Sequence, residues 1–270
     1  MGNLRLNSNQ IKIKMKKLLG LSIFLLAATT GNTQVLTSPK ASLKLEIKQN
    51  SGTNGSGLAY NPKTQLYYSV IAGNASYPLE VFDASGNNVY TTNAGNDMRG
   101  LWYNKKAKAV QGNTYNMKGI MEMSLDENGY PSIGSKNIGN CGQPDAQSVG
   151  VFDGKKYIYY FGGKLVRIYD PKKSEVKSET LVMEELMDGS YTINSTSMIY
   201  TGVKKHEYGF LDYNAKKVYL VNKKTGEITA TVNLPSDAVT NDMFRFAYAN
   251  GYVFLYDTQE RAWTGYKIFE

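Results

Sequence analysis

Asparagine and aspartate recur in this sequence at a nearly fixed distance before a series of aromatic residues. Five short apolar runs end on an aromatic, and an amide or carboxylate side chain comes six residues earlier, or seven in the third run. The five polar residues are Asn54, Asp97, Asp145, Asn194 and Asp242. Oxygen ligands that converge on one axis suit a hard cation, because Ca²⁺ takes about six to eight of them. The same groups also suit hydrogen bonding to a sugar or another polyol.

Two interpretations of this series stay open. In the first, the oxygens bind a ligand, and Asp97, Asp145 and Asp242 are the candidate metal ligands. Arg99 and Arg245 follow two of the aspartates closely and could each clamp a carboxylate or phosphate through two hydrogen bonds. In the second, the Asn and Asp side chains cap tight turns before strands, and each arginine pairs with its neighbouring aspartate.

Other catalytic constellations find little support in the residues. Three aspartates could supply acid, base and stabiliser for glycoside hydrolysis, but no glutamate occupies these positions. The chain has one histidine, His206, and one cysteine, Cys141, which excludes a zinc site built from nitrogen and sulfur ligands. A Ser-His-Asp triad would depend on His206, which falls in a turn expected on the side away from the Asn and Asp series. No phosphate-binding loop or dinucleotide fingerprint is present.

The aromatic residues of the series define a repeat. They are Tyr60, Tyr103, Phe152, Tyr200 and Tyr248, at spacings of 43, 49, 48 and 48 residues. A period near 45 residues, with turn residues and β-branched or aromatic strands inside each repeat, indicates a β-propeller in which one repeat is one four-stranded blade. The sequence therefore predicts an all-β fold of five blades. Six blades are the main alternative, if the longer repeats contain extra strands.

The last blade lacks one strand at the C-terminus, and the N-terminal region offers it. Residues 42–48 alternate apolar and polar side chains with the period of a strand. We expect this segment to complete the fifth blade and to close the ring, which leaves no open edge between the first and last blades. Residues 183–192 are expected to form a short helical insertion between the third and fourth blades.

The first 34 residues are predicted to be an extension and a signal peptide, ahead of a single propeller domain over 35–270. Met15, Lys16 and Lys17 precede an apolar run over 18–28, and small residues follow. A run of that length is typical of an export signal and is too short to span a bilayer. We expect an exported protein, periplasmic or secreted, without a membrane anchor.

The export signal carries most of the positive charge. Removing its five basic residues from the 31 of the chain leaves 26 against 23 acidic residues, a formal charge of +3. Lysine pairs recur at turns, which is typical of solvated hairpin tips and does not describe a groove for a nucleic acid. The pairs are Lys105-Lys106, Lys155-Lys156, Lys172-Lys173, Lys204-Lys205, Lys216-Lys217 and Lys223-Lys224.

The 21 tyrosines fall mostly on predicted strands, where they would pack between blades. Four others fall in predicted loops, where an exposed tyrosine offers a flat apolar face with a polar tip for contact with sugars or proteins. These are Tyr77, Tyr115, Tyr130 and Tyr191.

The turns Tyr60-Asn61-Pro62-Lys63 and Tyr169-Asp170-Pro171-Lys172 resemble those of secreted propellers in the YVTN and SMP-30-like group. The resemblance extends over residues 42–270 and is mostly structural. It implies a ring of six or seven blades, from which the five repeats of this chain depart. No functional residue is carried over from that group.

Three functions are compatible with these features. The favoured one is an exported, non-enzymatic module, monomeric, that binds a protein or a small polar ligand at the mouth of the propeller channel. The alternative is a Ca²⁺-dependent hydrolase or lactonase that uses the Asn and Asp series, and the third is a structural envelope protein. Three aspartates without glutamate or histidine suit one cation better than acid–base catalysis.

Overall fold

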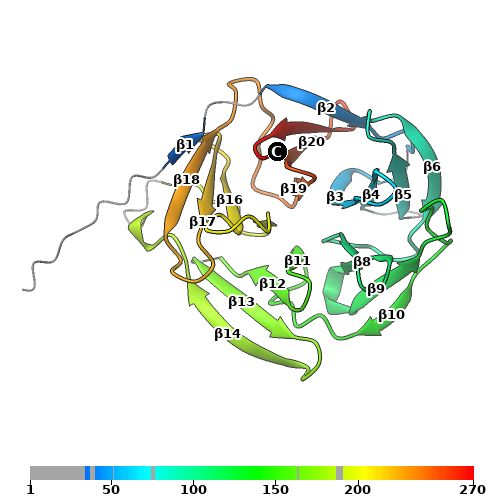
Figure 1. The fold of residues 1–270 in the computed structure, drawn as a ribbon, viewed down its shortest axis with the longest axis horizontal. Coiled ribbons are helices and arrows are strands. Elements are labelled where there is room, and N and C mark those ends of the chain that lie inside the picture. The colour runs from blue at the N-terminus through cyan, green and yellow to red at the C-terminus, as the bar shows by residue number, and fades with distance from the viewer. Residues whose placement is uncertain (1–33, 37–39, 51, 74–76, 163, 187–190) are drawn as a thin grey trace, which may run out of the picture. The chain divides into compact units, whose positions relative to one another are not determined.

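The computed structural model describes residues 34–36, 40–50, 52–73, 77–162, 164–186 and 191–270. These residues form five sheets arranged around a common centre, each with four antiparallel blade strands, which is a five-bladed β-propeller (Figure 1). The prediction of five four-stranded blades is confirmed. In each sheet the strands follow one another from the inside to the outside of the ring.

The four strands of each blade are joined in chain order. Blade 1 contains β3 (Asn54–Asn61), β4 (Leu66–Ala72), β5 (Pro78–Phe82) and β6 (Asn88–Asn93). Blade 2 contains β7 (Trp102–Asn104), β8 (Ala109–Asn113), β9 (Ile120–Ser124) and β10 (Lys136–Gly139). Blade 3 contains β11 (Gly150–Phe152), β12 (Tyr157–Tyr160), β13 (Leu165–Asp170) and β14 (Glu175–Leu181). Blade 4 contains β15 (Ile199–Tyr200), β16 (Tyr208–Asp212), β17 (Lys217–Val221) and β18 (Ile228–Asn233).

Blade 5 closes the ring with a strand from the N-terminal region, as the sequence predicts. It contains β19 (Phe246–Ala249), β20 (Tyr252–Asp257), β21 (Ala262–Lys267) and, as its outer strand, β2 (Ala41–Glu46). The segment after β2 leads into blade 1, and the carboxylate of Glu80 fixes the backbone of this segment. Glu80 is fully buried and accepts hydrogen bonds from the backbone N–H groups of Lys48 and Gln49, at 2.9 and 2.7 Å.

The core lies between neighbouring blades, where aromatic side chains pack on the faces of the sheets. The indole N–H of Trp263 in blade 5 donates to the Ser69 hydroxyl of blade 1 at 2.8 Å. Most strand tyrosines are buried, including Tyr67, Tyr159 and Tyr208. Burying an aromatic side chain removes roughly 150–250 Å² from water, so these residues account for much of the packing. The expectation that strand tyrosines pack between blades is confirmed.

One strand was not predicted. Strand β1 (Gln34–Leu36) pairs in parallel with β18 and extends the sheet of blade 4 to five strands. Two 3-10 helices complete the elements: η1 (Tyr115–Met117) and η2 (Glu184–Leu186). The second lies within the helical insertion expected over 183–192, of which residues 187–190 fall outside the described part. Of the predicted extension and signal peptide, residues 1–33 also fall outside it, whereas Gln34 begins β1. No helix of the described residues is long and apolar enough to cross a membrane.

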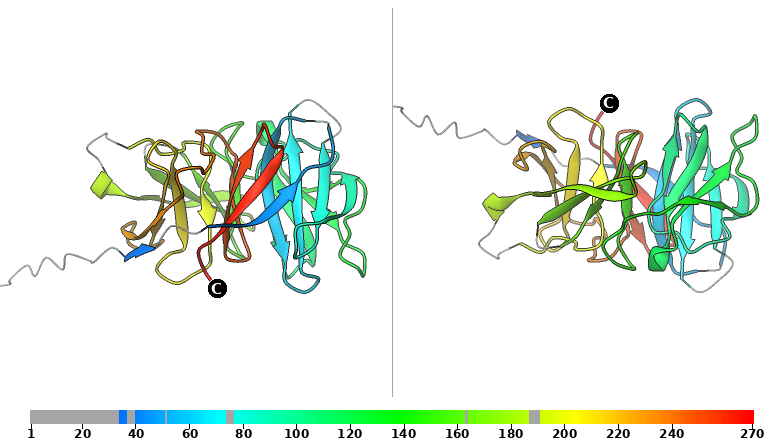
Figure 2. Two further views of the ribbon diagram at one scale, coloured as in Figure 1. Left: turned by 90° about the horizontal axis from the view of Figure 1, so that it is seen from above. Right: turned by 90° about the horizontal axis from the view of Figure 1, so that it is seen from below.

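The strands cross the ring from one face to the other (Figure 2). We call one face the aromatic face: there the inner strands end, and the turns 62–65, 105–108, 153–156, 201–207 and 250–251 lead back into the second strands. The opposite face is the loop face, where the loops before the inner strands carry the Asn and Asp series.

Candidate functional site

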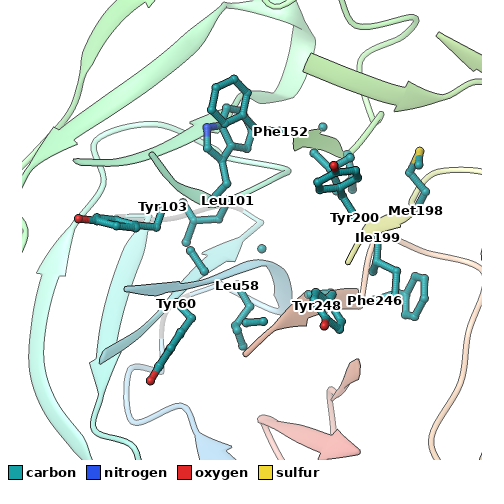
Figure 3. Close-up of a pocket in the computed structure, with 18 of the residues that line it drawn as sticks. Leu58, Tyr60, Leu101, Tyr103, Phe152, Met198, Ile199, Tyr200, Phe246 and Tyr248 are labelled. Carbon is teal, nitrogen blue, oxygen red and sulfur yellow. The ribbon is translucent and has the colours of Figure 1, made fainter. Parts of the chain in front are cut away.

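The inner strands of all five blades line a cavity of about 300 Å³ along the centre of the ring (Figure 3). Its wall is apolar, because glycine, alanine and branched aliphatic side chains face it. Among the described residues that line it there is no aspartate, glutamate, lysine, arginine, histidine or cysteine. The wall includes Leu58, Leu101, Val149, Val151, Met198, Ile199 and Phe246. We call this cavity the channel.

The five aromatic residues of the repeat form the rim of the channel at the aromatic face. Tyr60, Tyr103, Phe152, Tyr200 and Tyr248 all line the cavity, and each is half-buried. In Figure 3 the hydroxyl groups of Tyr60 and Tyr103 point away from the centre. Tyr60 and Tyr103 thus combine an apolar ring beside the channel with a hydroxyl directed away from its centre.

Most rim residues rest on a second aromatic ring, which fixes their orientation. The centroids of Tyr60 and Tyr67 are 4.7 Å apart, those of Phe152 and Tyr157 are 5.6 Å apart, and Tyr248 meets Phe269 edge-on. Burial raises the pKa of Tyr60, and it raises that of Tyr248 to about 12. These hydroxyls therefore stay protonated at neutral pH and serve as uncharged hydrogen-bonding groups.

At the loop face, Arg99 lies in the loop before β7 and is 5% exposed. Its guanidinium lies 4.6 Å from the ring centroid of Tyr115 and 4.8 Å from that of Phe244, and its Nε donates to Gln147 at 3.2 Å. Both terminal nitrogens donate to the carboxylate of Asp97, one of them at 3.2 Å. Arg99 therefore joins blades 2, 3 and 5 at this face, whereas the lining of the channel extends to Pro62 and Asn250 in the turns of the aromatic face.

A second buried group fixes the spacing of two inner strands. The Asn113 side chain is fully buried, and its Oδ1 accepts from the backbone N–H groups of Gly100 and Gly150, at 2.9 and 2.8 Å. Its Nδ2 donates to the carbonyl of Ser148 and to Oε1 of Gln143, at 2.8 and 2.9 Å. Blades 2 and 3 can approach closely here because both inner strands have glycine: a Cβ on Gly100 would lie 2.1 Å from the Gly150 carbonyl oxygen.

The Asn and Asp series lies on the loop face. Its members cap turns by hydrogen bonds or, in the case of Asp97, form an ion pair. Asp97 is paired with Arg99. Asp145 accepts from the N–H groups of Gln147 and Ser148 in its own loop, at 2.7 and 3.0 Å. Asn194 is fully buried and accepts from the N–H of Thr196 at 3.0 Å.

The two remaining members of the series lie beside blade 5. Asn54 accepts from Nε of Arg245 at 2.9 Å, so the neighbours of the two arginines differ: Arg99 meets a carboxylate and Arg245 an amide. Asp242 is exposed. The expected pairing of Asp242 with Arg245 is not found among the described residues, where no salt bridge joins them.

The structure does not gather the three candidate metal ligands. Within the described ranges, no group of three or more His, Cys, Asp or Glu side chains is placed to hold a metal ion. The physical reason is that the Asp97 carboxylate pairs with Arg99, and the Asp145 carboxylate accepts a backbone N–H of its own loop. The residue types in the Asn and Asp series permit a cation site, but local hydrogen bonds engage the side-chain oxygens of Asn54, Asp97, Asp145 and Asn194.

The remaining candidate residues, Cys141, His206 and the four loop tyrosines, make contacts within the fold. Cys141 is buried and packs with aromatic residues of blades 2 and 3. His206 lies in the turn after β15, with Nδ1 2.8 Å from the Thr229 hydroxyl, and burial lowers its pKa. Of the four loop tyrosines expected to be exposed, Tyr115 alone exceeds a third exposure, whereas Tyr77, Tyr130 and Tyr191 pack against the core.

Sequence reasoning placed a binding site at the channel mouth, but it did not consider the channel wall and the aromatic rim as candidate site residues. The signal was present, since the five rim aromatics are the residues that define the repeat. They were interpreted as structural markers because an aromatic at the end of a strand is also what blade packing requires.

Comparison with known proteins supports the fold. No family model matches the chain, and no curated protein matches it, so the resemblance to the YVTN and SMP-30-like group has no support from a family match. The structure is similar to that of glutaminyl cyclase from Myxococcus xanthus, with a TM-score of 0.53, 12% identity, and coverage of 87% of this chain and 94% of that one. A chain in a mitotic checkpoint complex has a TM-score of 0.38 at 10% identity, covering 79% of this chain and 63% of that one. The first likeness supports the propeller architecture and, at this identity, nothing finer.

Proposed function

We propose that this protein is an exported, non-enzymatic binding module that receives an uncharged apolar or aromatic group of its ligand in the channel, through the aromatic face. The observation that carries the proposal is the channel itself, an apolar cavity of about 300 Å³ with an aromatic rim contributed by all five blades. A ligand group in it would touch every blade of the ring.

The size and lining of the channel support binding. Ligand pockets of proteins span roughly 300–1,000 Å³ and are lined mainly by apolar and aromatic side chains. A cavity of about 150 Å³ is enough for one benzene molecule. The channel therefore has room for a group such as an indole, and the tyrosine hydroxyls at the rim supply the few polar groups that orient a ligand.

The ligand enters the channel from the aromatic face in this proposal, whereas the sequence predicted binding at the loop face. At the loop face Arg99 and Phe244 are buried and do not line the channel, whereas Pro62 and Asn250 in the turns of the aromatic face do. No contact in the described part of the chain favours the hydrolase or lactonase alternative, because Asp97 is paired with Arg99, Asp145 caps its own loop, and no group of three carboxylates is gathered there. Export is the remaining expectation from the sequence and is part of the proposal.

A titration with indole tests the proposal. Burying about 150–200 Å² of an aromatic molecule gives about 4 kcal/mol, so we expect a Kd of about 1 mM or lower by isothermal titration calorimetry. Val151→Phe should abolish binding, because Val151 is half-buried on the channel wall and the larger ring fills the space.

Val176→Phe is the matched control, since Val176 is 44% exposed on the outer strand of the same blade. It should bind indole like the parent protein. Equal binding by the parent and by Val151→Phe would place the indole site elsewhere and refute the proposal.

A further inference from the structure

We propose that the aromatic face binds an acidic segment of a partner polypeptide, which places one apolar or aromatic side chain in the channel and its neighbouring carboxylates on the lysines around the rim. This inference rests on the proposed function, because it names the partner of the same channel.

The structure gathers lysines on the aromatic face that are scattered in the sequence. The turns that follow the inner strands carry lysine in four of the five blades. These residues are Lys63, Lys105, Lys106, Lys108, Lys155, Lys156, Lys204 and Lys205. The turns between the third and fourth strands, at the same end, carry four lysines and four acidic residues and so add no net charge. Among them, Nζ of Lys223 lies 5.7 Å from the ring centroid of Tyr200. The net positive charge around the rim therefore comes from the turns that follow the inner strands of blades 1 to 4.

Little negative charge balances these lysines within the same turns, and one of them, Lys156, forms an ion pair with Asp170 at the end of β13. The two acidic residues there are Asp153 and Glu207. Asp153 caps its own turn by accepting from the N–H groups of Lys155 and Lys156, at 2.9 and 2.8 Å. Glu207 is 8% exposed. A partner with carboxylates is what such a face attracts and orients.

A second cavity connects the lysines with the rim. It has a volume of about 340 Å³ and lies between blades 2 and 3, lined by Tyr103, Phe152, Lys105, Lys106 and neighbouring turn residues. Tyr103 and Phe152 also line the channel, so the two cavities share a wall. Both lysines are exposed, and neither forms a salt bridge among the described residues. A chain with an apolar side chain in the channel would bring an adjacent carboxylate within their reach.

The shape of the face favours a polypeptide over other polyanions. The lysines surround one axis, whereas a nucleic acid is tracked by charges along a groove with stacking platforms. A membrane surface is met by protruding apolar side chains. None of the large apolar residues that are more than a third exposed lies in the turns after the inner strands, all of which the structure describes. The aromatic face thus presents the channel as a recess, and a partner would bind by inserting a side chain into it.

Two synthetic peptides with blocked ends test the inference by calorimetry on the protein from residue 35 onward. One has a tryptophan between two pairs of aspartates, and the other has lysines in place of the aspartates. We expect the acidic peptide to bind at least about tenfold more tightly, with an affinity that falls as salt rises.

The double substitution Lys105→Gln and Lys106→Gln should weaken the acidic peptide by about five- to tenfold and leave indole binding unchanged. The matched control is Lys216→Gln with Lys217→Gln, at a turn on the loop face, which should bind the peptide like the parent protein.

The outcomes separate this inference from the proposed function. If indole binds in the channel but the acidic peptide binds no better than the basic one, or is unaffected by the double substitution, the inference is wrong and the channel remains a binding site. If neither indole nor peptide binds, both fail. Tight binding of single-stranded oligonucleotides or of phosphatidylserine vesicles, without binding of the acidic peptide, would also overturn it.

Discussion

Asn113 offers the sharpest test of how the channel is held open. Its side chain makes four hydrogen bonds in a fully buried position, and two of them accept backbone N–H groups of the facing inner strands at Gly100 and Gly150. Asn113→Ala would leave those two donors without a partner. Each buried unsatisfied donor costs about 1–3 kcal/mol, so we expect a loss of about 4 kcal/mol in the free energy of unfolding.

That loss is a large part of a typical stability of about 5–15 kcal/mol. For a domain of this size, each kcal/mol lowers Tm by about 2–4 °C, so the variant should melt about 8–16 °C below the parent. Denaturant unfolding followed by fluorescence gives the free energy, and calorimetry gives Tm. Asn128→Ala, at an exposed turn, is the control and should change stability by less than about 0.5 kcal/mol. A loss below about 1 kcal/mol for Asn113→Ala would refute the role assigned to this network.

Three further predictions follow from buried or strained groups. Glu80→Gln should lower the free energy of unfolding by about 1.5–3 kcal/mol, because the negative charge that accepts the N–H groups of Lys48 and Gln49 is lost. Denaturant unfolding measures this loss, and an unchanged unfolding midpoint would contradict the prediction. Gly100→Ala should prevent stable folding, since its Cβ would lie 2.1 Å from the Gly150 carbonyl oxygen, and recovery of parent-like Tm would argue against that close approach. His206 has a lowered pKa in the folded protein, so the unfolded chain binds the extra proton more readily and stability should fall as pH drops below about 6.5. His206→Gln should reduce this fall between pH 7.5 and 5.5, and an identical fall in both proteins would assign it to other groups.

The sequence predicts the architecture well because propeller geometry repeats. Each rim aromatic marks the end of an inner strand, and the alternating pattern over 42–48 identifies the closing strand. Strand β1 could not be predicted in this way. It has three residues and pairs with the outer edge of blade 4, and a segment so short carries no periodicity.

The candidate site was predicted less well, for physical reasons that particular residues show. An aspartate before a strand has the same sequence signature whether it binds a cation or caps a turn, and Asp145 caps a turn. Arg99 follows Asp97 at a spacing that permits either an open clamp or an ion pair, and the aromatic rings of Tyr115 and Phe244 decide for the ion pair. The lysine pairs at turns were correctly placed at hairpin tips, but only the closed ring brings them around one axis.

Crystals soaked with 5-bromoindole test the central claim most directly, because the anomalous signal of bromine locates the ligand. The account predicts a single major bromine site inside the channel, between Leu58, Leu101 and Val151. A site at the loop face beside Asp97 and Asp242, or no site within the ring, would contradict it.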